Sequence, residues 1–463
     1  ISAAAKVADK VLNDLQFYQA KLPGVVGAWY FLSGQKLYQE FMALTLAAGS
    51  REDGARVLLA LERIRRLDRT TGSSAGNDGL RNALSSLQAE FPGTERSRFD
   101  TVNRSLLAFR RDSGWTPGVS GRAVLEAALS QLGRNDVLLT YYFSDDGNYA
   151  LPATRNGVKR IRLDAGSRLV QDMDALRQAL YSGFAPSDPG TLDALGRSLL
   201  GPVSGYLKER IYLLPYGPML GFPLDALRLN GRFLGGQSRL IRLESLSALQ
   251  SPGEGAVAFP IENVFLAGNP QAGQDLFSYG VKTSAELDAV RNEFIGEGLH
   301  MVQGVALRRD EFSDDRFERA NLLHLAMPGR VDLERPRESR LLLSGTRENP
   351  SAEFLSAGDL RGRRISAELA VLTGTAFSGQ PPTSFGSGTG LVSDLLQAGA
   401  AQVVYTLWPA GDQETAALMS DFYQRLSTGL TTEEALFQAR GVLIDSENPA
   451  NLKDWAGFQL FIR

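Results

Sequence analysis

The sequence contains no cysteine and only two histidines among its 463 residues. The absence of cysteine excludes disulfide bonds, thiolate metal sites and a thiol nucleophile in this chain. The two histidines, His300 and His324, have no carboxylates at the spacing of a metal-ligand set, so we expect no metal site. We also expect no organic cofactor. His300 is predicted to be an exposed residue of a strand.

The sequence also lacks a strong excess of charge and a long apolar run. The formal net charge is −3, so no global basic field attracts nucleic acid, and we expect no nucleic-acid partner. No apolar run reaches the roughly 18 residues that a membrane span needs, so we expect none. We therefore expect a soluble protein, with the cytoplasm favoured over the periplasm.

With 43% hydrophobic residues, the chain is long enough for about three folded domains. In residues 1–115, apolar residues recur three and four positions apart, which is the period of helices with one buried stripe. Paired helices with short turns favour TPR-like repeats, and a plain helical bundle is the alternative. We place a second domain at residues 116–262 and a third at residues 263–463.

Strand and helix patterns alternate in the remaining sequence, which predicts an α/β fold with a largely parallel sheet. A hairpin is expected at residues 137–143 and 148–154, with a third strand at 158–163. Further strands are expected at 210–215, 264–267, 299–302, 322–327, 368–373 and 402–407. Helices are expected at 168–182, 284–294, 308–319, 391–397, 413–426 and 432–444.

Two strand segments carry the most informative motifs. Residues 321–330 read Asn-Leu-Leu-His-Leu-Ala-Met-Pro-Gly-Arg, and residues 368–379 read Glu-Leu-Ala-Val-Leu-Thr-Gly-Thr-Ala-Phe-Ser-Gly. These segments resemble the His-x-Ala-x-His-Gly and Leu-Ser-Ala-Cys stretches of the caspase-like CHAT family. Residues 213–225 and 412–463 add to the resemblance, which covers residues 122–463. It implies a caspase-like α/β sandwich and, in the family, Cys/His peptide hydrolysis.

The resemblance places Pro328 at the position of the general base and Thr375 at the position of the nucleophile. Proline has no titratable group, and threonine is a poor nucleophile without a neighbouring base. We therefore expect no catalytic residue. Sites in such sheets lie at the carboxyl ends of strands, and the segments at Met327 and Thr375 are expected to occupy two such ends.

The resemblance also implies four residues of a former substrate cleft, namely His324, Gly329, Gly374 and Asp412. His324 matches the first histidine of the family motif, which is not the base, and we expect it to donate a ring hydrogen bond to the backbone. Asp412 matches an acidic position near the family's pocket. It is also placed to cap a helix at 413–426, because an aspartate before a helix accepts from free N–H groups.

These expectations favour a catalytically inactive pseudoprotease that binds or regulates a protein or peptide partner through the helical domain and the former cleft. One alternative is a hydrolase that uses a displaced serine or threonine, such as Ser378, with His324. Another is a nucleotide-responsive switch at residues 385–390, because a glycine-rich loop that opens a helix can bind phosphate.

Overall fold

The structure is a computed structural model. It describes residues 42, 54–55, 57–59, 61–62, 121–144, 147–163, 168–183, 189–249, 257, 261–271, 283–294, 296, 298–333, 336–345, 353–360, 363–378, 390–444 and 451–463. The chain divides into two compact units, Ile1–Ala127 and Ala128–Arg463. The few described residues of 42–62 are helical, and the predicted TPR-like repeats otherwise lie outside the described residues.

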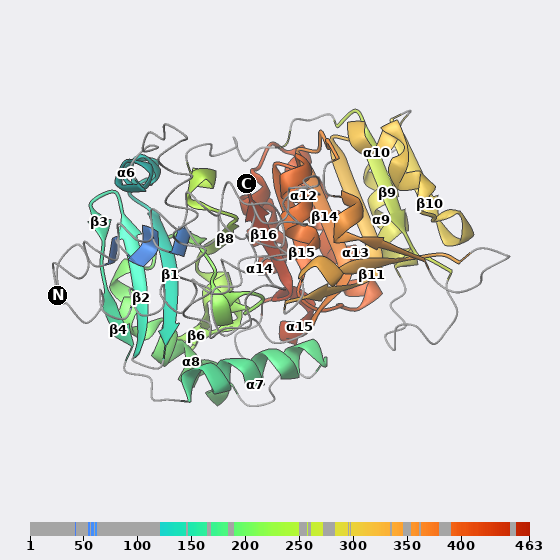
Figure 1. The fold of residues 1–463 in the computed structure, drawn as a ribbon. Helices are drawn as coiled ribbons and strands as arrows, with labels where there is room; N and C mark the ends of the chain where they lie inside the picture. Colours follow the sequence, from blue (N-terminus) through green and yellow to red (C-terminus); the bar gives the residue numbers. More distant parts are fainter. Residues whose placement is uncertain are drawn as a thin grey trace, which may run out of the picture. The chain divides into compact units, whose positions relative to one another are not determined.

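The second unit is built on one large sheet (Figure 1). Its strands, with the separate hairpin β6–β7, are β1 (Asp136–Ser144), β2 (Gly147–Thr154), β3 (Gly157–Val158), β4 (Ile161–Leu163), β5 (Arg210–Leu213), β6 (Arg228–Leu229), β7 (Arg232–Phe233), β8 (Arg239–Leu243), β9 (Val264–Gly268), β10 (Leu299–Gln303), β11 (Leu322–Asp332), β12 (Arg340–Leu343), β13 (Glu353–Ser356), β14 (Leu369–Ser378), β15 (Gln402–Thr406) and β16 (Phe458–Ile462).

The main path of the sheet runs β10-β9-β11-β14-β15-β16-β8-β5-β1-β2-β3. One block of the sheet contains the parallel strands β10, β9, β11, β14 and β15. A second block contains the parallel strands β16, β8, β5 and β1. The two parallel blocks meet at the antiparallel pair β15–β16. A short antiparallel branch, β12–β13, leaves the path from the end of β11. The α/β fold with a largely parallel sheet, predicted from the sequence, is confirmed.

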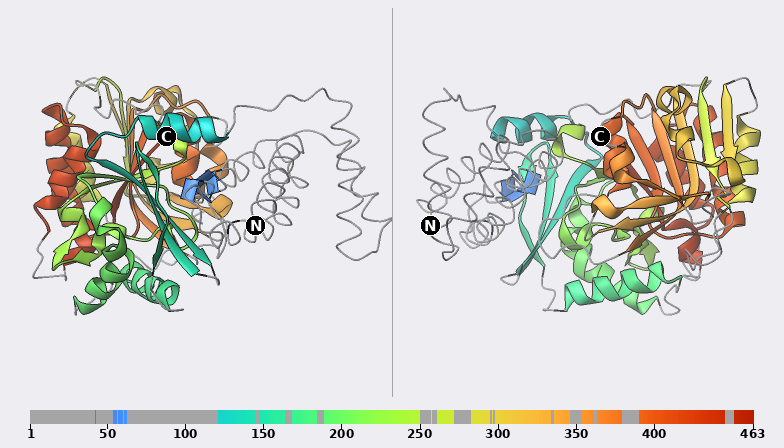
Figure 2. Two further views of the ribbon diagram at one scale, coloured as in Figure 1. Left: turned by 90° about the vertical axis from the view of Figure 1, so that its left-hand side faces the viewer. Right: turned by 45° about the vertical axis from the view of Figure 1, so that its right-hand side comes forward.

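Helices lie on both faces of this sheet (Figure 2). The α-helices are α6 (Gly121–Ser130), α7 (Leu169–Tyr181), α8 (Gly190–Leu199), α9 (Ser284–Glu293), α10 (Asp315–Arg319), α11 (Ala357–Leu360), α12 (Leu391–Ala398), α13 (Asp412–Ser427), α14 (Thr432–Gly441) and α15 (Leu452–Trp455). Successive strand residues face opposite sides. Leu323 and Leu325 of β11 share a core with the leucines of α12, whereas His324 between them contacts α9 and α13.

Two local predictions were wrong. The expected helix at 308–319 is a 3-10 turn, η7 (Asp310–Ser313), followed by the short α10. The break falls at Asp314, which has an extended backbone and whose carboxylate caps α10 by accepting from the Arg316 N–H. The expected third strand at 158–163 is divided into β3 and β4, which pair with different parts of β2.

Candidate functional site

A β-bulge in β11 holds the residue at the predicted base position. The register of β11 on β14 shifts between Ala326 and Gly329, so β11 carries one extra residue across this step. Pro328 lies in the bulge and is buried. Proline has no N–H for the ladder, and a bulge is one of the few places in a sheet that accepts it. The sequence therefore fits this backbone, and the side chain there cannot accept a proton.

Two glycines allow the strands to approach each other around this bulge. Gly374 has a φ of +74°, in the left-handed region that favours glycine. A Cβ on Gly374 would lie 3.0 Å from the carbonyl oxygen of Met327. A Cβ on Gly329 would lie 2.6 Å from the Leu341 side chain of β12. Both glycines of the expected former cleft are thus positions of close strand packing.

Beyond the bulge, β11 and β14 continue as a pair. Residues 329–332 pair with residues 375–378, and β12 pairs with the other edge of β11. The sequence predicted that these strands would end at Met327 and Thr373, which would open a site there. That prediction was wrong, because the bulge absorbs the proline–glycine step that was interpreted as a strand end.

Thr375, at the predicted nucleophile position, is enclosed by this strand pair. Its side chain is fully buried, with 0% exposure. Its hydroxyl donates to the carbonyl oxygen of Thr406 at 2.8 Å and lies 3.2 Å from the Thr406 hydroxyl. A carbonyl oxygen positions a hydroxyl but does not remove its proton at neutral pH. The hydroxyl is therefore held as a structural donor between β14 and β15.

His324 belongs to a buried network of side chains on the opposite face of the sheet from α12. Its Nε2 lies 3.0 Å from Oε1 of Glu286, and its Nδ1 lies 2.8 Å from the Tyr423 hydroxyl. The same Glu286 oxygen accepts from the Thr373 hydroxyl at 2.6 Å. The network joins β11, β14, α9 and α13. His324 is thus a structural residue, as expected, but its partners are side chains and not the backbone.

The phenol of Tyr423 stays protonated within this network. Burial raises the pKa of the Tyr423 phenol well above its ordinary value, and the negative charge of Glu286 raises it further. The phenol therefore keeps its proton at neutral pH, and its oxygen forms a hydrogen bond with Nδ1 of His324. Nε2–H of His324 donates to the Glu286 carboxylate. Both ring nitrogens are occupied, which leaves His324 no free position for a reacting hydroxyl.

Asp412 is a helix cap, although not of the helix that the sequence indicated. It is the first residue of α13, and Gly411 occupies the N-cap position. Its carboxylate oxygens instead accept from the backbone N–H groups of Ala285 and Glu286, each at 3.2 Å. These N–H groups are in the first turn of α9, where a negative charge also complements the helix dipole. Asp412 thereby fixes α9 against α13.

Of the two alternative sites, the structure describes Ser378 fully but only Gly390 of the predicted nucleotide loop. Ser378 accepts from Nε of Arg330 at 2.7 Å and donates to the carbonyl oxygen of Val331 at 3.4 Å. Its hydroxyl is therefore not bonded to His324, the base proposed for it. Residues 385–389 of the predicted nucleotide loop lie outside the described residues. Gly390, with a φ of +54°, packs where a Cβ would meet the Ser339 side chain.

Sequence reasoning did not identify the charged residues that follow the bulge. Arg330 and Asp332 of β11 and Arg340 of β12 line a cavity of about 690 Å³. The Arg-Val-Asp spacing on a strand places both charges on one face, and this pattern could have indicated a polar pocket. Glu286 was also missed, because its partners in β11, β14 and α13 are distant in the sequence.

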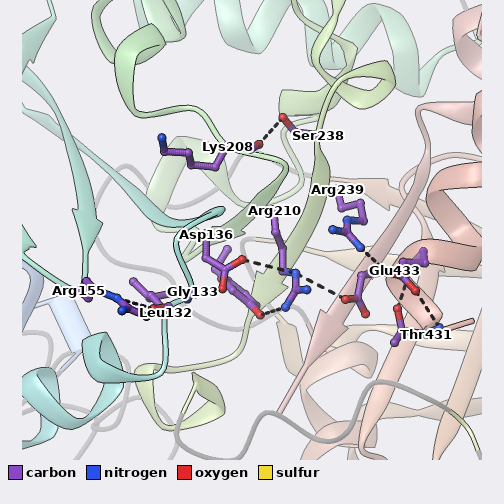
Figure 3. Close-up of polar contacts among 12 residues, drawn as sticks. Leu132, Gly133, Asp136, Arg155, Lys208, Arg210, Ser238, Arg239, Thr431 and Glu433 are labelled. Carbon is purple, nitrogen blue, oxygen red and sulfur yellow. Dashed lines mark hydrogen bonds and ion pairs between the residues drawn. The ribbon is translucent and has the colours of Figure 1, made fainter.

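Another polar cluster lies where β1, β5 and β8 begin (Figure 3). Nε of Arg210 lies 3.7 Å from carboxylate oxygens of both Asp136 and Glu433. Arg239 pairs with Glu434 at 2.6 Å, and Glu434 forms a capping box with Thr431 at the start of α14. This cluster attaches the N-terminus of α14 to the sheet, so its role is structural.

Neither a metal-binding group nor a membrane-spanning helix is found among the described residues. In that part of the chain, no three histidine or acidic side chains form a group that could hold a metal ion. None of the helices described there is long and apolar enough to cross a membrane.

The large, mostly parallel sheet with helices on both faces defines a mixed α/β protein. The CHAT domain family matches residues 190–462, which is more than half of the chain. The chain belongs to the CHAT domain family.

Other similarities are more limited. Mouse tetratricopeptide repeat protein 28 is 32% identical over 107 residues, which is 23% of this chain and 4% of that protein. The chain therefore spans a small fraction of this relative. A separase–securin complex from Saccharomyces cerevisiae has a TM-score of 0.47 at 11% identity, over 99% of this chain and 40% of that chain. The Arg-specific cysteine proteinase gingipain R has a TM-score of 0.32 at 10% identity, over 64% and 75% of the two chains.

Proposed function

We propose that this CHAT-domain protein is a pseudoprotease, which binds or regulates a protein or peptide partner without hydrolysing peptide bonds. The observation that carries the proposal is the buried hydroxyl of Thr375, which donates to a backbone carbonyl oxygen. A hydroxyl nucleophile needs a neighbouring base to take its proton. Pro328 at the base position supplies none, and the protein contains no cysteine.

The alternative, hydrolysis by Ser378, lacks a base beside the serine hydroxyl among the described residues. The partner of Ser378 is the guanidinium of Arg330, which offers only N–H donors and cannot act as a base. Hydrolysis by Ser378 would require another group to accept its proton. The nucleotide-switch alternative depends on residues 385–389, which lie outside the described residues, and no observation favours it.

The partner that we propose is a protein or a peptide, bound through the helical residues 1–115 and the surface around the former cleft. A net charge of −3 disfavours a nucleic acid, whose binding depends strongly on neutralisation of phosphates by basic residues. We propose three domains, at 1–115, 116–262 and 263–463, and place partner binding on the first and on the former cleft in the third.

A peptidase assay tests this proposal. We expect no turnover of a fluorogenic peptide library by the native protein, by Thr375→Ala or by the double variant Pro328→His/Thr375→Cys. The double variant regains a thiol and an imidazole, but position 375 is buried and position 328 lies in a bulge. A cysteine there cannot reach a substrate carbonyl, and catalysis requires reacting atoms to be about 3 to 3.5 Å apart.

The variants distinguish a native protein that is an active peptidase from an inactive one whose site is open to peptides. Turnover by the native protein that Thr375→Ala abolishes would disprove the pseudoprotease proposal itself. Turnover by the double variant alone would leave the native protein inactive, but it would show that the site is open to peptides. The library should contain peptides with basic, acidic and apolar residues before the labelled bond, so that a change of specificity is detected.

A further inference from the structure

A cavity lies beside the bulge, and the network of buried residues around His324 does not account for it. It has a volume of about 690 Å³, within the range of small-ligand pockets. Its wall includes Arg309, Arg330 and Arg340 together with Asp332, Glu338 and Glu353. Arg330 follows Pro328 by two residues, or about 7 Å along the strand. The cavity therefore adjoins the former catalytic position.

Each of the three arginines is held by an internal partner that leaves other N–H donors free to bind. Nη2 of Arg309 donates to Asp359 at 2.6 Å. Arg330 donates through Nε to Ser378 at 2.7 Å and through Nη2 to Asp332 at 3.2 Å.

The guanidinium of Arg340 stacks over the Phe354 ring, 4.3 Å from its centroid. Stacking uses the face of a guanidinium and leaves its N–H edge available, so this group is oriented for a planar oxyanion.

The three arginines of the wall are all exposed, whereas Glu338 is the one exposed acid among the three that line it. The side chains of Arg309 and Arg330 are 56% and 46% exposed, whereas that of Asp332 is only 4% exposed. Arg340 is exposed, and among the described residues no carboxylate pairs with it. Glu353 is half-buried in the wall and Glu338 is exposed. These two acids would repel a dense anion such as a polyphosphate more strongly than a single carboxylate, because repulsion grows with charge.

We propose that this cavity binds a glutamate or aspartate side chain of an acidic peptide segment, through the guanidinium groups of Arg330 and Arg340. The inference rests on the proposed function and adds the chemical class of the partner. The paired N–H groups of an arginine match the two oxygens of a carboxylate. The position favours a peptide, because the proposed function places a protein or peptide partner on the surface around Pro328, two residues before Arg330.

Fluorescence polarisation with three labelled nine-residue peptides tests the proposal. The peptides share a serine and valine background and carry two glutamates, two glutamines or two lysines. We expect the glutamate peptide to bind the full-length protein, and Arg340→Gln to weaken that binding roughly tenfold, as expected for loss of a charge-assisted hydrogen bond. Arg319→Gln is the matched control, because Arg319 is 77% exposed on α10 and does not line the cavity. It should leave the affinity unchanged.

Several results would overturn the assignment. These are equal binding of the glutamine peptide, equal weakening by Arg319→Gln, or no binding of the glutamate peptide below about 1 mM. Competition by inorganic phosphate at matched ionic strength as strong as that by the unlabelled peptide would make this a simple anion site. Mass spectrometry of the peptides after incubation separates the two proposals, because cleavage would disprove the pseudoprotease while leaving a preference for glutamate intact.

Discussion

Replacement of Glu286 by alanine is expected to lower the free energy of unfolding by about 3 to 5 kcal/mol. Glu286 is buried, and one of its oxygens accepts from both His324 and Thr373. Its loss leaves two buried donors without an acceptor and opens a void between α9 and β11. Chemical denaturation, followed by the fluorescence of the buried Trp408 and Trp455, measures the change.

Two further variants make this prediction specific. Asp288→Ala removes another carboxylate of α9, but that side chain is 58% exposed, so we expect less than about 0.5 kcal/mol. Glu286→Gln keeps an oxygen acceptor and should cost less than the alanine, about 1 to 3 kcal/mol. If Glu286→Ala cost no more than Asp288→Ala, the network would not stabilise the fold and the structural role of His324 would be wrong.

Replacement of Asp225 by alanine is expected to lower the free energy of unfolding by a similar amount, about 3 to 5 kcal/mol. Asp225, in the 3-10 turn η3 (Leu224–Ala226), accepts from Nη1 of Arg440 at 2.5 Å and from Nε2 of Gln459 at 3.0 Å. Arg440 and Asp225 have side-chain exposures of 3% and 0%. Without the carboxylate, the Arg440 guanidinium remains charged in the interior, and burial of an unpaired charge is costly.

A double variant distinguishes loss of the ion pair from loss of packing. Asp225→Ala/Arg440→Met removes both charges and leaves an apolar side chain of similar length, and replacement of a buried pair in this way is often close to neutral. We therefore expect the double variant to be more stable than Asp225→Ala in the same denaturation assay. A double variant less stable than the single one would contradict the assigned role of the unpaired Arg440 charge.

The alternation of strands and helices was predictable because their apolar patterns are local. The patterns at 264–267 and 402–407 correspond to β9 and β15, since buried parallel strands are short continuous apolar runs. The ends of β11 and β14 were not predictable in the same way. Pro328 and Gly374 normally terminate strands, but here they occupy the bulge and its partner. That outcome depends on pairing between segments about fifty residues apart.

The candidate site was predictable in its residue types but not in its contacts. The sequence motifs indicated that positions 328 and 375 lack a base and a thiol. They did not indicate that Thr375 would bond to Thr406, or that His324 would bond to Glu286 and Tyr423. These partners lie 31, 38 and 99 residues away. Only the packing of α9 and α13 on the sheet brings the partners of His324 together.

The accessibility of position 375 decides whether a nucleophile there could reach a substrate. Because the native sequence has no cysteine, Thr375→Cys provides a single thiol whose reaction with a maleimide can be followed without background. We expect labelling of the folded protein to be more than about a hundredfold slower than that of Thr428→Cys, an exposed threonine at the end of α13, because a buried thiol reacts only after local opening. Both variants should label equally in denaturant. Labelling of Thr375→Cys as fast as Thr428→Cys in the folded protein would contradict the pseudoprotease proposal, because the position predicted for the nucleophile would then be open to substrate.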